Sequence, residues 1–328
     1  MLKEEVLSML LNAQEPVSGE GICKTLGVTR AAVWKTIDQL RQEGYGIDAA
    51  PKRGYTLASV PDRLDTALVR AHLSGHPWQT LVTAVPSVDS TNNACKRLAA
   101  EGAPDGTVVL TGCQTAGKGR RGRTFVSPPG GLYFSVILRP HAKPEALMHL
   151  TAMAAVAAAR AIFAVSGVYP DIKWTNDLVL GGKKLCGILT ELEWEAESGD
   201  LSCVIIGAGI NVSQDEADFG PEVAPIAISL AQALGTAPDR TELAARVIRS
   251  LNALYDDFPS QNAAYLECFR RDCLTVGNPI KVISGAGERI GTATGISDDF
   301  GLTVRWEDGS TETLTSGEVS VRGLYDYV

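Results

Sequence analysis

Hydrophobic positions at the start of the chain recur with helical spacing, which predicts three short helices. Gly27 and Thr29 separate the second helix from the third, as a turn glycine and an N-cap residue. Two short strand patterns follow, and this order is typical of a winged helix-turn-helix. The expected helices cover residues 2–11, 18–26 and 30–43, and the strands cover residues 45–48 and 54–57.

Further along, apolar strand patterns alternate with helical ones, and few helices separate successive strands. A mixed but mainly antiparallel sheet is therefore expected. Its strands are predicted at 81–85, 107–113, 132–138, 171–174, 184–193 and 202–211, and the helices at 91–100, 146–165, 241–258 and 261–272. Five short strands split by glycine turns, including the hairpin signal Asp308-Gly309, close the chain and predict a small SH3-like barrel.

The pattern indicates a multidomain α+β protein. We expect a winged helix-turn-helix at residues 1–60, a sheet domain at 61–273 and the barrel at 274–328. The chain has 328 residues, a net charge of −8 and seven cysteines without a C-x-x-C pair, which favours reduced thiols. The first residues lack the apolar core of a secretion signal, and the run 150–165 is interrupted by Arg160 and too short to span a bilayer. A cytoplasmic protein without membrane contact is expected.

The net negative charge argues against nucleic acid as the partner of the whole protein, but a small DNA-reading module remains compatible with it. Residues 1–60 contain seven Lys or Arg and seven Asp or Glu, so this section is neutral. Its cations nevertheless fall on the third helix and the wing, where DNA contact requires them. The expected DNA-contacting residues are Thr29, Arg30, Lys35, Lys52 and Arg53. A three-helix protein-interaction module is the alternative.

The segment Gly117–Arg123 holds three glycines and four cations, a composition suited to wrapping an anion. The segment contains the pattern G-x-G-x-x-G of dinucleotide-binding loops. The overlapping stretch from Gly112 reads G-x-x-x-x-G-K, but Gly119 stands where this phosphate-binding motif requires Ser or Thr. Both nucleotide motifs require a helix immediately afterwards. The following residues include Pro128 and Pro129 and cannot form one. We therefore reject both motifs; a solvated basic loop is the remaining simple explanation.

Several polar clusters accompany this loop. Ser90-Thr91-Asn92 lies at a strand-to-helix junction, where it could cap the helix or bind a small amide or urea. Gln114 precedes the loop, Lys173–Asp177 follows a predicted strand, and the next turn is predicted at 181–185. Asn211 ends the apolar strand 204–210. Each cluster alone has a structural explanation.

Together these clusters resemble the bifunctional biotin protein ligases that double as biotin operon repressors. The matching motifs are S-T-N at 90–92, the Gly/Arg loop at 117–123, K-W-x-N-D at 173–177, K-L-x-G-I-L at 184–189 and G-x-G-I-N-V at 207–212. They run in the family's order between a winged helix and a small barrel, so the resemblance covers essentially the whole chain. Two positions depart from it: Lys118 replaces the loop's first arginine, and Thr175 stands where the family usually has proline.

The resemblance implies a class II synthetase or biotin ligase-like fold and a two-step reaction. ATP and biotin would form biotinyl-5′-AMP and pyrophosphate, and the mixed anhydride would then be attacked by a lysine of a biotin carboxyl carrier protein. Mg²⁺ is an expected companion of ATP. The adenylate-bound protein would form a homodimer that binds operator DNA through residues 1–60 and represses biotin synthesis genes.

The resemblance also assigns roles to individual residues. Catalysis would rest on Lys184, Arg120 and Arg121. Biotin would be bound by Ser90, Thr91, Asn92, Gln114, Gly117, Lys118, Gly119, Arg120, Lys184, Leu185 and Gly187, and ATP or the adenylate by Arg120, Arg121, Arg123, Asn176, Asp177, Asn211 and Arg322. Asp177 is also the candidate Mg²⁺ ligand. Two alternatives stay open: a lipoate-type ligase, and a biotin-sensing repressor without ligase activity.

Overall fold

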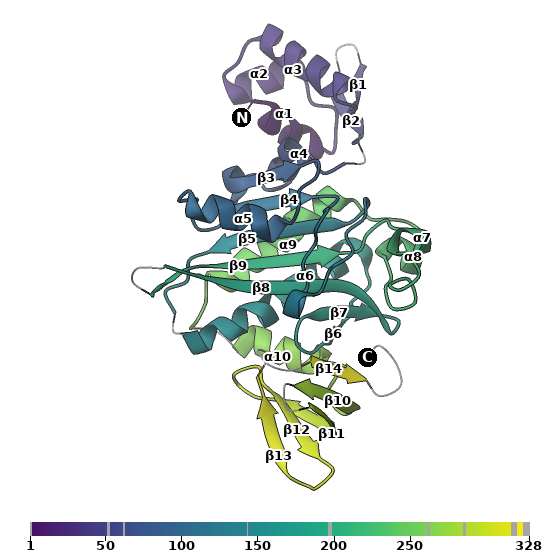
Figure 1. The fold of residues 1–328 in the computed structure, drawn as a ribbon. Helices are drawn as coiled ribbons and strands as arrows, with labels where there is room; N and C mark the ends of the chain where they lie inside the picture. The colour runs from purple at the N-terminus through teal and green to yellow at the C-terminus, as the bar shows by residue number, and fades with distance from the viewer. Residues whose placement is uncertain are drawn as a thin grey trace.

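The computed structural model has three parts arranged one after another: the N-terminal helices, a central sheet and a set of C-terminal strands (Figure 1). It describes residues 2–50, 53–61, 63–142, 144–195, 199–260, 263–284, 287–315 and 320–323, without the side chains of 144, 145, 148 and 320–323.

The N-terminal part is the expected winged helix-turn-helix. It consists of α1 (Leu2–Leu11), α2 (Gly19–Leu26), α3 (Arg30–Gln42), β1 (Gly46–Ala50) and β2 (Gly54–Ser59), and β1 and β2 pair antiparallel. The turn chemistry follows the prediction. Gly27 ends α2 with φ +67°, and the Thr29 hydroxyl accepts a hydrogen bond from the Ala32 amide at 3.2 Å.

Helix α4 (Thr66–His72) was not predicted from the sequence, and it joins the N-terminal part to the sheet. Its Leu68 lies in the same hydrophobic core as Leu7 of α1, and Arg70 pairs with Glu4 at 3.2 Å. The helix is short, so tertiary packing stabilises it more than its own propensity does. The domain division at residues 60 and 273 stays a prediction.

The central sheet has seven strands in the order β3-β4-β5-β9-β8-β7-β6. Only β3 and β4 run parallel, which confirms the mainly antiparallel expectation. The strands are β3 (Val82–Val85), β4 (Val108–Thr111), β5 (Leu132–Leu138), β6 (Asp171–Lys173), β7 (Asp177–Leu180), β8 (Lys183–Trp194) and β9 (Leu201–Ile210). The predicted turn at 181–185 was too long, because β8 already begins at Lys183 and leaves only a tight turn of two glycines after β7.

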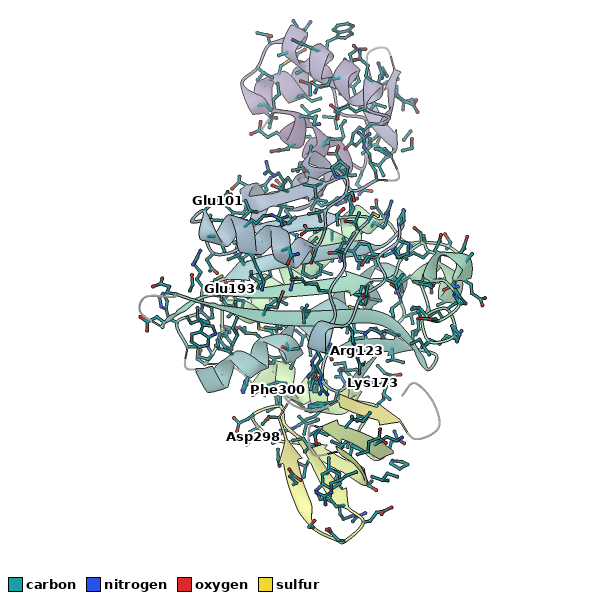
Figure 2. The ribbon with its side chains drawn as sticks, in the orientation of Figure 1. Glu101, Arg123, Lys173, Glu193, Asp298 and Phe300 are labelled. Carbon is teal, nitrogen blue, oxygen red and sulfur yellow. The ribbon has the colours of Figure 1, made fainter. Side chains whose placement is uncertain are left out.

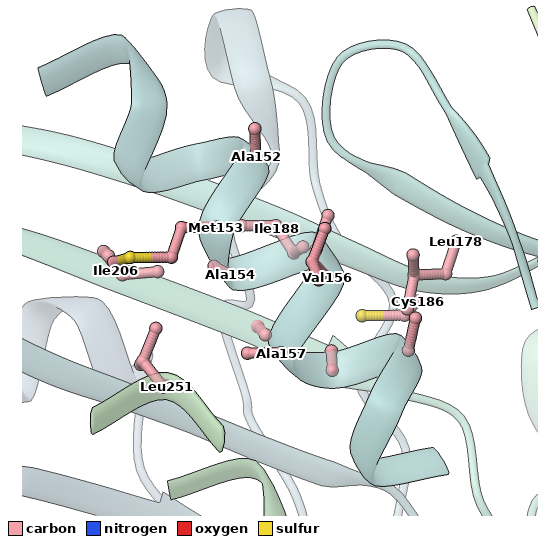
Figure 3. Close-up of a cluster of buried hydrophobic side chains, with 14 of the residues drawn as sticks. Ala152, Met153, Ala154, Val156, Ala157, Leu178, Cys186, Ile188, Ile206 and Leu251 are labelled. Carbon is pink, nitrogen blue, oxygen red and sulfur yellow. The ribbon is translucent and has the colours of Figure 1, made fainter. Parts of the chain in front are cut away.

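Two separate hydrophobic layers cover the faces of this sheet. Helix α5 (Thr91–Ala100) packs through Cys95 on one face. On the other face α6 (Met148–Ser166), α9 (Arg240–Tyr255) and α10 (Ala263–Asp272) form the main core. Figure 3 shows α6 side chains such as Met153 in one cluster with Ile206 of the sheet and Leu251 of α9. Two short helices that the sequence analysis missed, α7 (Glu216–Phe219) and α8 (Leu230–Leu234), lie in the connection after β9.

Helix α6 corrects one expectation from the sequence. With 19 residues it is longer than the apolar run suggested, and by length and composition alone it could cross a membrane. However, 67% of its window His149–Ser166 is buried inside the protein, as in the core helix of a globular domain.

The C-terminal part is a five-stranded antiparallel sheet in the order β13-β12-β11-β10-β14. Its strands are β10 (Pro279–Ser284), β11 (Gly287–Ile296), β12 (Leu302–Trp306), β13 (Thr311–Leu314) and β14 (Ser320–Gly323). Gly309 adopts φ +84° in the expected hairpin turn. The Trp174 indole donates a hydrogen bond to the Phe300 carbonyl at 2.9 Å, so the turn after β6 is attached to this sheet.

Candidate active site

A cleft opens where the start of α5 meets strands β5, β8 and β9. Gly187, Gly207 and Gly209 form its floor. A Cβ atom at Gly207 would collide with Asn92, and one at Gly209 would lie 2.5 Å from the Phe125 ring. The cleft is lined by Ser90, Thr91, Asn92, Gln114, Lys118, Phe125, Gly187, Leu189, Gly207, Ala208 and Gly209. Because glycine has no Cβ, side chains or a ligand can approach the backbone of this floor more closely than any other residue would allow.

A chain of hydrogen bonds runs along one end of this cleft. The Thr91 amide donates to Gln114 Oε1 at 2.8 Å, and Ser135 Oγ lies 2.7 Å from Thr91 Oγ1 and 2.6 Å from Asn92 Oδ1. Ser90 occupies the N-cap position of α5, but its side chain makes no capping hydrogen bond. Helix capping therefore does not account for Ser90, which lines the cleft instead.

A half-buried carboxylate holds Asn92 in place. Glu191 Oε2 accepts a hydrogen bond from Asn92 Nδ2 at 2.7 Å, and Glu191 pairs with Lys96 at 2.9 Å. Burial pushes the pKa of Glu191 upward, but the hydrogen bond from Asn92 and the Lys96 charge outweigh it, and the pKa lies below its usual range. Glu191 stays ionised at neutral pH, so it accepts only and fixes the orientation of the Asn92 amide.

The cationic loop, Gly117–Arg123, folds back on itself beside the cleft. The Gly119 amide donates to the Arg123 carbonyl at 2.7 Å, and Arg121 takes φ +57°. No helix follows before β5, so the rejection of both nucleotide motifs is confirmed. Lys118 Nζ donates to Asn93 Oδ1, which attaches the loop to α5.

Phe125, just after the loop, lies over the glycine floor. Its ring approaches the backbone of both Gly187 and Gly209, and it makes an edge contact with Tyr133 at 6.4 Å between ring centroids. Lys184 Nζ lies 5.5 Å from the same ring centroid, within cation–π range. The loop thus carries an aromatic cover for the cleft.

Arg120 turns inward, whereas Arg121 and Arg123 are exposed. Its Nη1 donates to Thr175 Oγ1 at 2.7 Å and to Asn176 Oδ1 at 3.2 Å. Burial lowers the pKa of Arg120, partly offset by the nearby Asp177 carboxylate. An arginine guanidinium is not deprotonated in proteins, so Arg120 keeps its charge despite this lowering.

Lys184 and Asp177 form an ion pair of 2.7 Å at the opposite end of the floor from Asn92. A bulge where β7 meets β8 inserts Leu185, so Lys184 and Gly187 face the same side although they are three residues apart. Lys183, the neighbouring lysine, is exposed. The two lysines of this turn therefore have different environments, and the resemblance had pointed to Lys184 alone.

The structure differs from the sequence expectations at Leu185 and leaves the roles expected of Asn211 and Arg322 as predictions. Leu185 was expected beside biotin, but it is fully buried in the main core and does not line the cleft, because the bulge turns it to the α6 face. Asn211 is buried, and its amide donates to the Lys184 and Ile228 carbonyls. The backbone of Arg322, in β14, pairs with that of Lys281 in β10, but the side chain of Arg322 lies outside the described part of the chain.

The predicted DNA-contacting residues that the structure describes lie at the start and on the outer face of α3 and on the wing. Arg30 and Lys35 are exposed, and Arg30 pairs with Glu20 at 3.1 Å between side chains that are each 79% exposed. Trp34, between them, is 62% exposed, the largest exposed fraction among the described large hydrophobic residues. Arg53 is also exposed, whereas Lys52 lies outside the described residues.

Metal binding has limited support from protein ligands. Among the described residues no group of three or more His, Cys, Asp or Glu side chains could hold an ion. Asp177 offers one carboxylate, already paired with Lys184. Mg²⁺ commonly binds through one or two carboxylates and substrate phosphates, so this arrangement fits a nucleotide-borne ion better than a resident one.

Sequence reasoning missed four residues that shape the cleft: Phe125, Ser135, Glu191 and the hydroxyl of Thr175. Ser135 had a visible signal in the sequence, because it is the one aliphatic hydroxyl in the otherwise apolar or aromatic strand 132–138. Glu191 had none, since its contact with Asn92 joins residues 99 positions apart. Contacts of this kind depend on the tertiary fold.

Comparison with known proteins agrees with this geometry. A model of the biotin/lipoate A/B protein ligase family matches residues 84–211, an HTH domain model matches 3–56, and a biotin protein ligase C-terminal domain model matches 275–322. The bifunctional ligase/repressor BirA of Bacillus spizizenii is 35% identical over 94% of this chain and 95% of its own length. That of Escherichia coli is 32% identical over 97% and 96%, respectively.

Solved structures show the same relationship. The biotin protein ligase from Aquifex aeolicus in complex with biotin and ATP superposes with a TM-score of 0.65 and 29% identity, covering 74% of this chain and 98% of that one. Because the full-length relatives match all three parts in the same order, the chain belongs to the family of the BirA bifunctional ligase/repressors.

Proposed function

We propose that the protein activates biotin with ATP to biotinyl-5′-AMP and transfers the biotinyl group to a lysine of a biotin carboxyl carrier protein. The observation that carries this proposal is the order of chemistry along the cleft. Hydrogen-bonding groups at Asn92 lie at one end, an apolar glycine floor follows, and Lys184 with Arg120 lies at the other. Biotin has the same order: a urea head, an apolar body and a carboxylate.

The cations favour the first step. A carboxylate and a polyphosphate are both anionic, so their approach needs positive charge that is already in place. Asp177 holds Lys184 and Thr175 holds Arg120, so both cations are positioned before the substrates bind. Lys184 would bind the carboxylate and α-phosphate, while Arg121, Arg123, Asn176, Asn211 and Arg322 would contact the nucleotide. Mg²⁺ would accompany the phosphates beside Asp177 and offset their charge.

The urea-binding end of the cleft separates biotin from lipoate. Thr91, Asn92 and Gln114 place polar groups at this end of the cleft, which suits the donors and the acceptor of a urea head and not a head group without such atoms. ATP–pyrophosphate exchange measures this directly. We expect exchange that depends on biotin and is negligible with lipoate, and equal exchange with both acids would contradict the assignment.

The same chain would act as a biotin-responsive repressor of biotin synthesis genes in the cytoplasm. Support comes from the exposed Arg30, Trp34 and Lys35 on the outer face of α3, the helix expected in the major groove. A homodimer with bound adenylate would place two such helices on paired half-sites. We expect the affinity for the operator to rise when biotin and ATP are both present. An affinity that does not change with either would contradict the coupled switch and leave the ligase proposal unaffected.

A further inference from the structure

The hydroxyl of Thr175 is one of the points where the cationic loop is attached to the sheet domain. Thr175 is buried, and its Oγ1 accepts a hydrogen bond from Arg120 Nη1 at 2.7 Å across 55 residues of sequence. The same oxygen lies 3.3 Å from Asn176 Oδ1, to which it donates. Thr175 therefore uses its hydroxyl as acceptor and donor at once, as a buried hydroxyl should.

Hydrogen bonds hold the turn that carries Thr175 in a fixed position. Asn176 Nδ2 donates to the Ile188 carbonyl of β8 at 2.7 Å, so its oxygen is turned toward Arg120. The Trp174 amide and indole donate to Thr275 Oγ1 and to the Phe300 carbonyl at 3.0 and 2.9 Å. The turn that carries Thr175 is thus fixed to both the central and the C-terminal sheets before any ligand binds.

The other side of the contact is the loop, whose glycines give its backbone conformational freedom. Arg120 is its one inward-facing arginine, and five residues later Phe125 covers the glycine floor. A hydrogen bond to a charged group is worth about 1.5–3 kcal/mol, enough to shift a loop equilibrium roughly tenfold or more. Arg120 also donates to Asn176 Oδ1 at 3.2 Å, so loss of the Thr175 bond removes the shorter of these two contacts and should loosen the loop and its aromatic cover.

We propose that Thr175 is a positioning residue that anchors the cationic loop through Arg120 and so limits escape of the acyl-adenylate. The inference rests on the proposed ligase function, because it concerns how the same cleft retains its product. Thr175 touches no reacting atom in this account. It sets how long the loop stays over the cleft once biotinyl-5′-AMP has formed.

The test compares Thr175→Val, which keeps the shape and removes the hydroxyl, with Thr175→Ser, which restores it. Enzyme loaded with labelled biotin and ATP is passed through a desalting column, and the rate of label loss is followed. We expect roughly tenfold faster loss for the valine variant and wild-type retention for the serine variant. Thr124→Val, an exposed threonine in the same segment, is the matched control and should retain label normally.

A double-mutant cycle shows whether the effect passes through Arg120. Arg120→Ala should release the adenylate as fast as the double variant does, so that Thr175→Val adds nothing in that background. Equal retention by wild type and Thr175→Val would overturn the proposal. So would a double variant whose rate of label loss rises by the product of the increases that the two single substitutions cause. If wild-type protein forms no adenylate at all, the ligase proposal fails instead, and the two failures are distinguishable.

Discussion

The ligase cleft and the outer face of α3 bind their proposed partners in opposite ways. In the cleft, Asn92 and Arg120 are held by internal hydrogen bonds before a ligand arrives. On α3, Arg30, Trp34 and Lys35 stand in solvent, and the one ion pair there is highly exposed. Preorganisation of this kind favours tight and specific binding of a small molecule, whereas exposed cations supply affinity for any DNA and little sequence information.

The largest expected effect tests the charged end of the cleft. Lys184→Ala removes the cation paired with Asp177 and leaves that carboxylate beside the expected site of the phosphates. We expect biotin-dependent pyrophosphate exchange to fall by roughly 100- to 1,000-fold, the cost of removing one preorganised stabilising group. Lys183→Ala is the matched control, since Lys183 is exposed. Near-normal exchange in Lys184→Ala would show that another group supplies the charge.

A second substitution tests the urea end. Gly207→Ala would push a methyl group into Asn92 Oδ1 and displace that amide from Ser135 and Glu191. We expect the KM for biotin to rise at least tenfold and the free energy of unfolding to fall by about 1–3 kcal/mol. Gly295→Ala, where no atom lies within 4 Å, serves as the control for a glycine substitution in a strand. An unchanged KM would remove Asn92 from the account of biotin binding.

The α3 face allows a contrast between a cation and an aromatic residue. Lys35→Ala should weaken binding to operator and unrelated DNA alike and reduce the salt slope by about one. Trp34→Ala should weaken operator binding selectively, because an apolar side chain in the major groove discriminates thymine methyl groups. Electrophoretic mobility shifts at several salt concentrations measure both. Adenylation should be unchanged in each variant, and parallel losses for the two substitutions would make Trp34 a nonspecific contact.

The smallest effect is expected at Lys118, where the loop departs from the family pattern. Its ammonium donates to Asn93 Oδ1, a contact that a guanidinium can replace. Lys118→Arg should therefore change the KM for biotin and ATP by less than about threefold. A larger change would mean that this position is tuned to the compact charge of lysine.

Most of the fold could be predicted from the sequence, because helical and strand periodicities report local structure. The turn glycine Gly27 and the cap Thr29 follow from backbone chemistry alone. Helix α4 escaped prediction because its seven residues are stabilised by packing against α1, a tertiary effect. The short strand β7 escaped because its pairing with β8 includes a bulge that no local pattern signals.

The site was predicted less completely than the fold. Motif resemblance named Thr91, Asn92, Gln114 and Arg120, and the structure brings all of them to the walls of one cleft or its loop. Resemblance also pointed to Leu185, which the bulge turns into the core. It treated Thr175 only as a departure, whereas its hydroxyl is a contact that no motif contains.

The central claim is that the cleft selects biotin and delivers it to a protein lysine. It is tested most directly by mixing the protein with ATP, a biotin carboxyl carrier domain and equal amounts of distinguishably labelled biotin and lipoate. The account predicts biotin on the carrier lysine, little or no lipoate, and no labelling without ATP. Lipoate on the carrier at a level similar to biotin, or no label from either acid, would contradict it.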